Sequence, residues 1–220
     1  MTSLQKLYTN PHKNLLPFNN GRPCTRGTAP LTSMLNQNNF GSLKRDQQLQ
    51  SKWGEGLLAG VAYLHSLGLV HGNLTLDCLY VDMRNDELLV GNLDGCMTPS
   101  QLKSLSGVSD LYAPPEKFSG GSMSRAADIW ACGVILYYIF NKKFAFSKAV
   151  RPATYPSGCM FQWYTTFDAG FLTTLKYANL VTVLKQMLVT LPGNRMELAI
   201  ITRDLYPLVK DFSDVKVSFD

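Results

Sequence analysis

The chain of 220 residues is 45% hydrophobic, which suffices for one domain with a buried core and excludes disorder throughout. No apolar run approaches the roughly eighteen residues of a membrane span, and the first twenty residues are too polar for a secretory signal, so we expect an intracellular, cytoplasmic protein. The net charge of +5 arises in the first 50 residues, where six Lys and Arg accompany one acid. Without a dense basic run or interleaved aromatic residues, a solvated segment is favoured there over a site for nucleic acid or an acidic partner.

Residues 1–30 are expected to form a basic, mostly irregular N-terminal extension. They contain four prolines and show neither helical nor strand periodicity. A short amphipathic helix is expected to begin near Leu31. Its cap is expected at Thr32 or Ser33, and its inward side chains are Met34 and Leu35.

Residues 46–67 predict a long helix with one buried side, because apolar residues recur at spacings of three and four. Gly68 follows the last periodic residue, where a left-handed cap would end the helix without steric cost. The recurring apolar residues are Trp53, Leu57, Val61 and Leu64.

The middle of the chain predicts two short strands followed by a buried helix. Residues 79–82 and 87–92 read as extended pieces joined by a charged turn, which indicates a small antiparallel hairpin. A loop rich in Ser, Thr and Gly covers about residues 95–110. Residues 126–140 are apolar nearly all round, which predicts a central helix that is covered on every side.

Two further helices are predicted at residues 180–188 and 196–209, because Pro192 and Gly193 break the pattern between them. Five cysteines lie far apart without a C-x-x-C pair, so we expect reduced thiols that are mostly buried rather than a metal site.

Four stretches, taken in order, resemble the C-terminal lobe of a eukaryotic protein kinase. "AYLHSLGLVHGNLTLDCLYVD" resembles the helix and catalytic loop H-R-D-L-x-x-x-N, and "LLVGNLDG" resembles the strand leading into D-F-G. "YAPPE" resembles A-P-E, and "ADIWACGVILYYI" resembles the motif D-x-W-x-x-G-V of the central helix. The resemblance covers roughly residues 31–209.

The resemblance implies a mainly α fold: a kinase-like C-terminal lobe, a helical bundle with a small β-hairpin carrying the catalytic loop. We expect this lobe at residues 31–210, after the extension at 1–30 and before a tail at 211–220. The first 30 residues contain neither G-x-G-x-x-G nor a V-A-I-K-like strand, so we expect the N-terminal lobe to be absent. Apolar residues of the extension would then cover the exposed upper surface: Leu4, Leu7, Tyr8, Leu15, Leu16 and Phe18.

Several structural positions of the family are kept. The resemblance implies that Asp128, near Trp130, accepts hydrogen bonds from backbone amides around His71; an exposed acid at a helix N-terminus is the plainer alternative. It also implies a buried ion pair between Glu116 and Arg195, for which a surface pair is the alternative.

The chemical positions of the family are changed. The resemblance places Asn73 where the family has its catalytic Asp, and Thr75 where it has a phosphate-binding Lys. Cys78 and Asn92 stand at the two Mg-ATP positions, where the family has Asn and Asp. Asp94 would face the same side as Asn92 in an extended strand and rescue metal binding, but a turn acid is the simpler interpretation.

Gly72 replaces an Arg that commonly grips a phosphorylated activation segment in the family. Phosphorylation of the following loop would therefore lack its usual partner, and control by loop phosphorylation is not expected. The hydroxyl residues in question are Thr98, Ser104, Ser106 and Ser109.

These features favour a catalytically impaired kinase-like domain that acts as a scaffold for protein partners. Its candidate partner surfaces are residues 95–115 and the groove near residues 167–175. No cofactor is expected beyond weak binding of Mg-ATP, and neither nucleic acid nor a membrane is an expected partner. A Ser/Thr kinase or kinase fragment with residual transfer activity and an unrelated helical domain are the alternatives.

Overall fold

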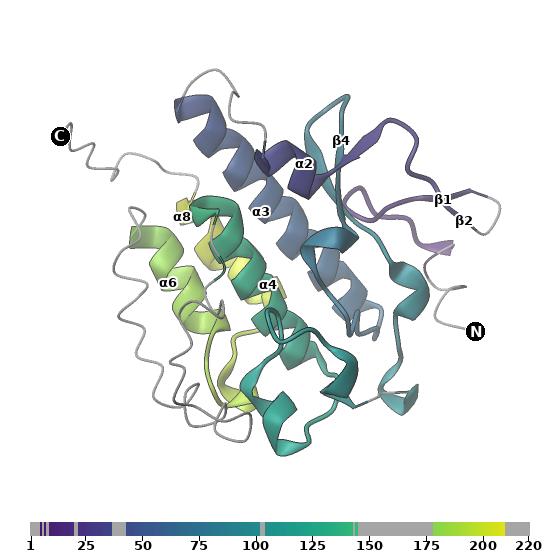
Figure 1. Ribbon diagram of the computed structural model, residues 1–220, viewed down its shortest axis with the longest axis vertical. Coiled ribbons are helices and arrows are strands. Elements are labelled where there is room, and N and C mark those ends of the chain that lie inside the picture. Colours follow the sequence, from purple (N-terminus) through teal and green to yellow (C-terminus); the bar gives the residue numbers. More distant parts are fainter. Residues whose placement is uncertain are drawn as a thin grey trace.

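The computed structural model describes residues 9–19, 22–36, 43–101, 104–142 and 178–209, together with Gln5, Leu7 and Phe144. This part of the chain is mostly helical and carries a small antiparallel sheet beside the first long helix, which is the class that the sequence predicts (Figure 1). The expected groove at 167–175, the tail at 211–220 and Cys159 lie outside the described residues.

Two long helices, α3 (Leu43–Ser66) and α4 (Arg125–Asn141), run side by side through the middle of the domain (Figure 1). The predicted apolar stripe of α3 is fully buried, and α4 is buried nearly all round. Ser124 caps α4, since its hydroxyl oxygen accepts a hydrogen bond from the amide of Ala127 at 3.1 Å. Gly68 ends α3 with a φ of +74°, as its position in the sequence predicts.

The main sheet has three antiparallel strands in the order β3 (Thr28–Pro30), β4 (Leu79–Asp82) and β5 (Glu87–Val90). The β4–β5 hairpin was predicted from the sequence. Strand β3 was not predicted, because its extended conformation depends on pairing with residues about fifty positions away. A separate antiparallel pair consists of β1 (Phe18–Asn19) and β2 (Arg22–Pro23).

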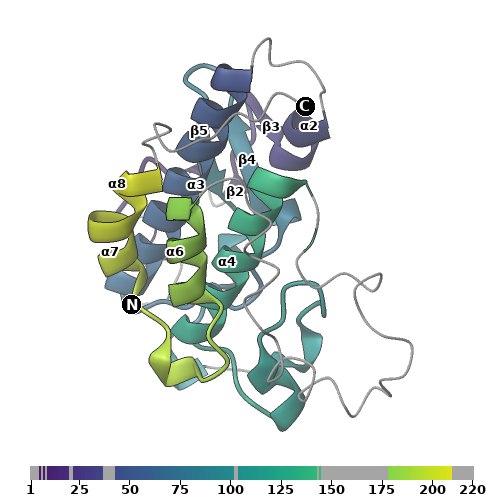
Figure 2. The same ribbon diagram turned by 90° about the vertical axis from the view of Figure 1, so that its left-hand side faces the viewer.

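Helix α2 (Leu31–Asn36) follows β3 directly, with Met34 and Leu35 buried as predicted. The expected cap at Thr32 or Ser33 is wrong, because the chain enters the helix straight from the strand and places both residues in the first turn. Helix α6 (Ala178–Met187) packs against α4 (Figure 2).

The predicted helix at residues 196–209 is divided into three pieces: α7 (Leu198–Ile200), the π-helical turn η9 (Ile201–Leu205) and α8 (Tyr206–Val209). Pro207 has no N–H for the carbonyl of Arg203, so the regular α-helical ladder cannot continue through this point. The buried hydroxyl of Tyr206 donates to the carbonyl of Ser51 at 2.9 Å and ties this end of the chain to α3.

The described loops contain several short 3-10 turns. These are η1 (Leu76–Cys78), η2 (Leu93–Gly95), η3 (Pro99–Gln101), η4 (Leu105–Gly107), η5 (Pro115–Ser119) and η8 (Pro192–Asn194).

Four of the five cysteines are described, and all four are free thiols; Cys24 is half-buried and the other three are buried. No helix in the described ranges is long and apolar enough to cross a membrane.

Part of the N-terminal extension is docked on the domain. The amide of Leu16 donates to the carbonyl of Val90 at 2.8 Å, and the amide of Val90 donates to the carbonyl of Asn14 at 2.8 Å. Leu7, Leu15 and Leu16, three of the six apolar residues named for this segment, are buried. Leu4, Tyr8 and the side chain of Phe18 lie outside the described part.

Two glycines of α3 make room for this docked segment. A Cβ atom on Gly60 would lie 2.7 Å from the carbonyl oxygen of Asn14, and one on Gly56 would lie 2.9 Å from the Asn14 Nδ2 atom. The Asn14 side chain is itself buried and donates to the carbonyl of Leu88 at 2.9 Å. The segment is therefore fitted closely between α3 and β5.

Candidate functional site

Asp128, in the first turn of α4, anchors the loop that begins at His71. Its Oδ2 atom accepts the amide of His71 at 2.8 Å, and its Oδ1 atom accepts the amide of Gly72 at 2.9 Å. These are the hydrogen bonds that the resemblance implies. The Asp128 residue is 2% exposed, so these charge-assisted bonds are buried. A third bond, from His65 of α3 at 2.9 Å, joins the Asp128 carboxylate to that helix.

His71 links this loop to the chain segment after β5. Its Nε2 atom lies 3.0 Å from the carbonyl oxygen of Gly91, and because a carbonyl can only accept, Nε2 carries the proton. The Nδ1 atom then accepts the amide of Asn73 at 3.4 Å, which requires a neutral ring. Burial lowers the pKa of His71, partly offset by the negative charge of Asp128. The role of His71 here is structural.

Glu116 and Arg195 form a bidentate ion pair with two N–O distances of 2.7 Å, the pair that the resemblance implies. The Arg195 side chain is 0% exposed, and that of Glu116 is 13% exposed. Arg195 also donates to the carbonyl of Ala126 at 2.9 Å, and its guanidinium carbon lies 5.0 Å from the ring centre of Trp130. The pair thus joins the segment at η5 to α4 and to the loop before α7.

Asn73, Thr75 and Cys78 lie along the loop that follows His71. Asn73 is exposed, Thr75 is half-buried and Cys78 is buried. The Cys78 thiol donates to the carbonyl of Asn73 at 3.4 Å, so the Thr75 hydroxyl, also 3.4 Å from the sulfur, donates to Cys78. The three residues therefore bind one another and close the loop locally.

Asn92 lies just beyond the Gly91 carbonyl that His71 binds, so the two chain segments carrying Asn73 and Asn92 are joined by that hydrogen bond. Asn92 has a φ of +56°, a left-handed conformation that Asn tolerates better than most side chains, and it is exposed. Asp94 is exposed in the 3-10 turn η2. Strand β5 ends at Val90, so the strand alternation that would place Asp94 beside Asn92 does not apply, and the turn interpretation fits.

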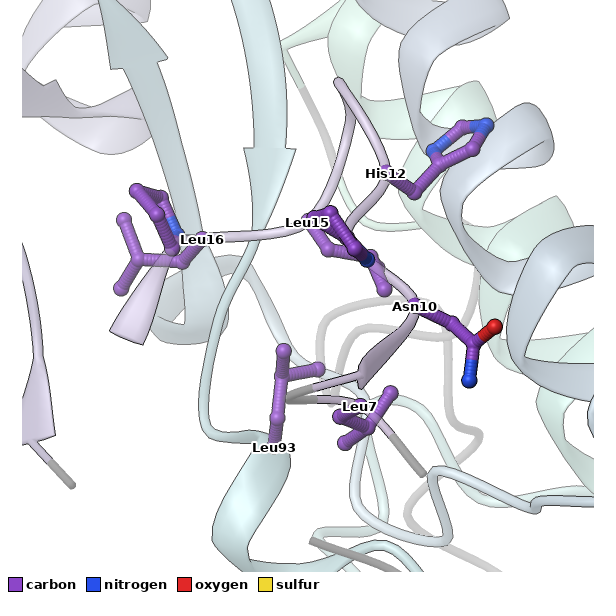
Figure 3. A pocket seen from close by; sticks show the side chains of 8 residues that line it. Leu7, Asn10, His12, Leu15, Leu16 and Leu93 are labelled. Carbon is purple, nitrogen blue, oxygen red and sulfur yellow. The ribbon is translucent and has the colours of Figure 1, made fainter. Parts of the chain in front are cut away.

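A pocket of about 120 Å³ lies next to η2, between Leu93 and the docked N-terminal segment (Figure 3). Its walls are mostly apolar, and none of the residues expected at the catalytic or Mg-ATP positions lines it. The pocket is lined by Leu7, Asn10, Pro11, His12, Leu15, Leu16, Pro17 and Leu93.

Two features of the site were missed in the sequence. His65 donates from Nε2 to the Oδ2 atom of Asp128 at 2.9 Å, and its place one turn after Val61 on the buried face of α3 was the available signal. The second is Leu16, whose Cδ2 atom would lie 3.2 Å from a Cβ on Gly91, so the docked segment packs against the backbone that His71 binds. Only the glycines inside α3 hinted at such a close approach.

Comparison with known proteins places these features in a family. The sequence profile of the protein kinase domain matches residues 24–206. "Fatty acyl-CoA synthetase and RNA processing-associated kinase 1" of Saccharomyces cerevisiae is 41% identical over 88 residues, which are 38% of this chain and 10% of that protein.

Two longer matches have lower identity. "Serine/threonine-protein kinase KIN4" of Saccharomyces cerevisiae is 29% identical over 159 residues, 68% of this chain and 19% of that protein. "CBL-interacting serine/threonine-protein kinase 8" of Arabidopsis thaliana is 27% identical over 172 residues, 76% of this chain and 36% of that protein. The chain thus spans between about a tenth and about a third of the length of these relatives. With the family match covering most of its length and the motif positions in place, the chain belongs to the protein kinase domain family.

Proposed function

We propose that this domain is a catalytically impaired protein kinase-like domain, which binds protein partners as an interaction or regulatory scaffold and does not transfer phosphate. One contrast carries the proposal. Asp128 accepts the loop amides and Glu116 pairs with Arg195, as the family motif implies. The positions that match the family's catalytic and Mg-ATP residues carry neutral side chains instead.

The missing base is the first support. In the family, a carboxylate orients the substrate hydroxyl and accepts its proton. Asn73 is exposed at this position, and a neutral amide cannot take up a proton at physiological pH. The side chain of Thr75, at the matched Lys position, brings no positive charge to the developing negative charge of a transferred phosphate.

The weak metal-binding set is the second support. Magnesium prefers oxygen ligands in octahedral geometry, and the buried thiol of Cys78 is a poor ligand for it. The remaining carboxylates near these positions in the sequence are Asp77 and Asp94, both of them exposed. Because Cys78 replaces an oxygen ligand of the family by a thiol and Asn92 replaces its charged carboxylate by a neutral amide, we propose weak binding of Mg-ATP at most.

We also propose that the described residues from Leu31 to Val209 correspond to the helical, C-terminal lobe of the family. The order of α3, the β4–β5 hairpin, α4 and the pair Glu116–Arg195 supports this assignment. Neither a G-x-G-x-x-G loop nor a V-A-I-K-like strand precedes them in these 220 residues. We further propose that the protein is cytoplasmic.

A residual Ser/Thr kinase is the second candidate. The names of the matched relatives, most of which are serine/threonine-protein kinases, favour it. The exposed carboxylates of Asp77 and Asp94 lie near the changed positions in sequence. Against it stands the simultaneous change at Asn73, Cys78 and Asn92, because each lost group typically lowers the rate by about 10²- to 10³-fold.

A thermal-shift titration of the purified chain with ATP and magnesium separates the two candidates. Binding at 100 times Kd adds about 2.7 kcal/mol to the free energy of unfolding, which is readily seen as a higher Tm. We expect no magnesium-dependent shift. A shift that needs both ATP and magnesium would support the enzyme instead, and titration with ATP and EDTA is the control.

A further inference from the structure

His12 lies in the docked N-terminal segment, where its ring accepts a backbone hydrogen bond. The amide of Asn14 donates to the His12 Nδ1 atom at 3.2 Å. An imidazole nitrogen accepts only when it carries no proton, so this bond requires a neutral ring with its proton on Nε2. A proton taken up by the ring would therefore go to Nδ1, the atom that holds the bond.

Asn14 makes several of the bonds that attach this segment to the domain. The residue is 1% exposed, its side chain donates to the carbonyl of Leu88 at 2.9 Å, and its carbonyl accepts the amide of Val90 at 2.8 Å. Protonation of His12 would take the acceptor away from the Asn14 amide in a buried setting, which is costly for a backbone donor. The charge on the His12 ring therefore acts directly on the attachment.

Tyr63 of α3 holds the His12 ring in place. The two rings stack with 4.5 Å between their centres and 18° between their planes. The Tyr63 hydroxyl also donates to the carbonyl of Asn10 at 3.2 Å, on the same turn of the segment. The His12 ring is half-buried by this packing, and its Nδ1 atom stays directed at the Asn14 amide.

The surroundings of His12 oppose a positive charge on its ring. Burial lowers the pKa of His12, and the charge of the adjacent Lys13 lowers it further. Glu87 of β5 faces this segment, but its carboxylate is already shared between Lys13 at 3.7 Å and Lys52 of α3 at 3.8 Å. The Tyr63 ring would attract a charged His12, and the loss of the amide bond acts against that attraction.

Two further titratable groups lie on the chain that the segment covers. His71 binds the carbonyl of Gly91 at 3.0 Å, and the backbone of Gly91 packs against Leu16. Asp94 is exposed in η2. Since His71 also reaches this contact, its titration has to be told apart from that of His12.

We propose that His12 is a proton-sensitive latch of the docked segment: its neutral ring holds residues 10–16 on α3 and β5, and proton uptake at Nδ1 releases them. Release would open the apolar pocket that the segment lines and uncover Leu15 and Leu16, which are 6% and 3% exposed in the docked state (Figure 3). The inference goes beyond the proposed function and does not depend on it, because it involves neither a nucleotide nor the matched catalytic positions.

Amide hydrogen exchange at two pH values tests the latch. The amides of Leu16 and Val90 report docking, since each bonds across the contact between the segment and β5. Their protection factors, which correct for the pH dependence of intrinsic exchange, should fall several-fold between about pH 7.5 and about pH 5.5. One proton taken up per opening limits the fall to about tenfold, because a free histidine has an ordinary pKa of about 6.5. Equal protection at both pH values would overturn the proposal.

His12→Asn is the matched variant. The Oδ1 atom of an asparagine can accept the amide two residues on, as Nδ1 of His12 does, but it does not titrate. We expect the protection factors of Leu16 and Val90 in this variant to be the same at both pH values. An equal fall in His12→Asn and in the parent chain would assign the effect to another group, such as His71, and would refute the latch.

An NMR titration of the parent chain keeps the test decisive if the segment docks poorly in His12→Asn. The ring protons of His12 should titrate with a midpoint below the ordinary value of 6.5, and protection at Leu16 should decrease over the same pH range. A midpoint at or above 6.5, or a loss of protection in a different range, would contradict the latch. Both readouts are taken without ATP, so phosphate transfer by the chain would contradict the scaffold proposal while leaving the latch intact.

Discussion

Two sets of polar residues lie in neighbouring parts of the domain and differ in burial. The first set is Asp128 and Arg195, and the second is Asn73 and Asn92. Asp128 and Arg195 are buried and bind backbone groups and charged partners on several elements. Asn73 and Asn92 are exposed. From this contrast we expect the stability of the fold to depend strongly on Asp128 and Arg195 and little on the side chains of Asn73 and Asn92.

The effect of a substitution on the free energy of unfolding explains why one set can change while the other is kept. Removing one partner of a buried, hydrogen-bonded charge leaves the other without compensation and strongly destabilises the protein. Exchanging an exposed carboxylate for an amide usually changes the free energy of unfolding very little. A sequence can therefore lose the chemical groups of a kinase and keep its architecture, and the following predictions probe that difference.

The largest effect is expected for Arg195→Ala. This change leaves the Glu116 carboxylate, whose side chain is 13% exposed, without its bidentate partner, so the free energy of unfolding should fall by about 3 to 5 kcal/mol. Urea unfolding followed by tryptophan fluorescence measures it. The matched control is Arg203→Ala, which removes an exposed pair with Asp204 and should leave the unfolding midpoint unchanged. Similar midpoints for the two variants would mean that the buried pair does not hold the fold.

A smaller loss is expected for Leu16→Ala in the docked N-terminal segment. Leu16 is 3% exposed and packs against Gly91, so its truncation should cost about 2 to 4 kcal/mol by leaving a cavity. Leu208→Ala, at a side chain that is 51% exposed, should change stability by at most about 0.5 kcal/mol. If Leu16→Ala unfolded at the same urea concentration as the control, the segment would not belong to the core.

The smallest effect is a loss of stability in mild acid. Burial lowers the pKa of His71 below its ordinary value of 6.5 in the folded state. Above that value the ring is neutral in both states and contributes nothing; as pH falls below it, the unfolded chain binds a proton that the folded chain does not, so stability decreases. Melting curves at about pH 7.5 and about pH 5.5 measure the change.

His71→Gln supplies the comparison for this pH effect. It should reduce the acid-dependent decrease in Tm without abolishing it, because burial lowers the pKa of His12 as well and gives a dependence of the same sign. A steeper decrease in the variant than in the parent chain would contradict the neutral, buried ring deduced for His71.

Local sequence patterns predicted the long helices and the hairpin, but not the features that depend on distant residues. The stripe of α3 and the apolar surface of α4 are visible as periodicity. The docking of Asn14 on Leu88 joins residues 74 positions apart, and no local pattern encodes such a contact. Gly56 and Gly60 were an indirect sign of it, since glycine weakens a helix and is expected inside one where another segment approaches closely.

Some contacts of the candidate site were predicted from the sequence and others were not. The partners of Asp128, Glu116 and Arg195 followed from the family motif, because those residues bind fixed backbone and side-chain groups. The place of Asp94 did not, since the sequence alone could not show that β5 stops at Val90 and turns into η2.

A phosphate-transfer assay tests the central claim most directly. The purified chain is incubated with γ-labelled ATP, magnesium and a mixture of Ser- and Thr-containing peptides, with the Asn73→Asp/Asn92→Asp double variant alongside. We predict no label above background on any peptide or on the chain itself. The unmodified chain has a neutral amide at the position of the proton acceptor, and the double variant restores two carboxylates but still carries Thr75 and Cys78 at the matched Lys and Asn positions. Label that accumulates with time on a peptide incubated with the unmodified chain would contradict the account.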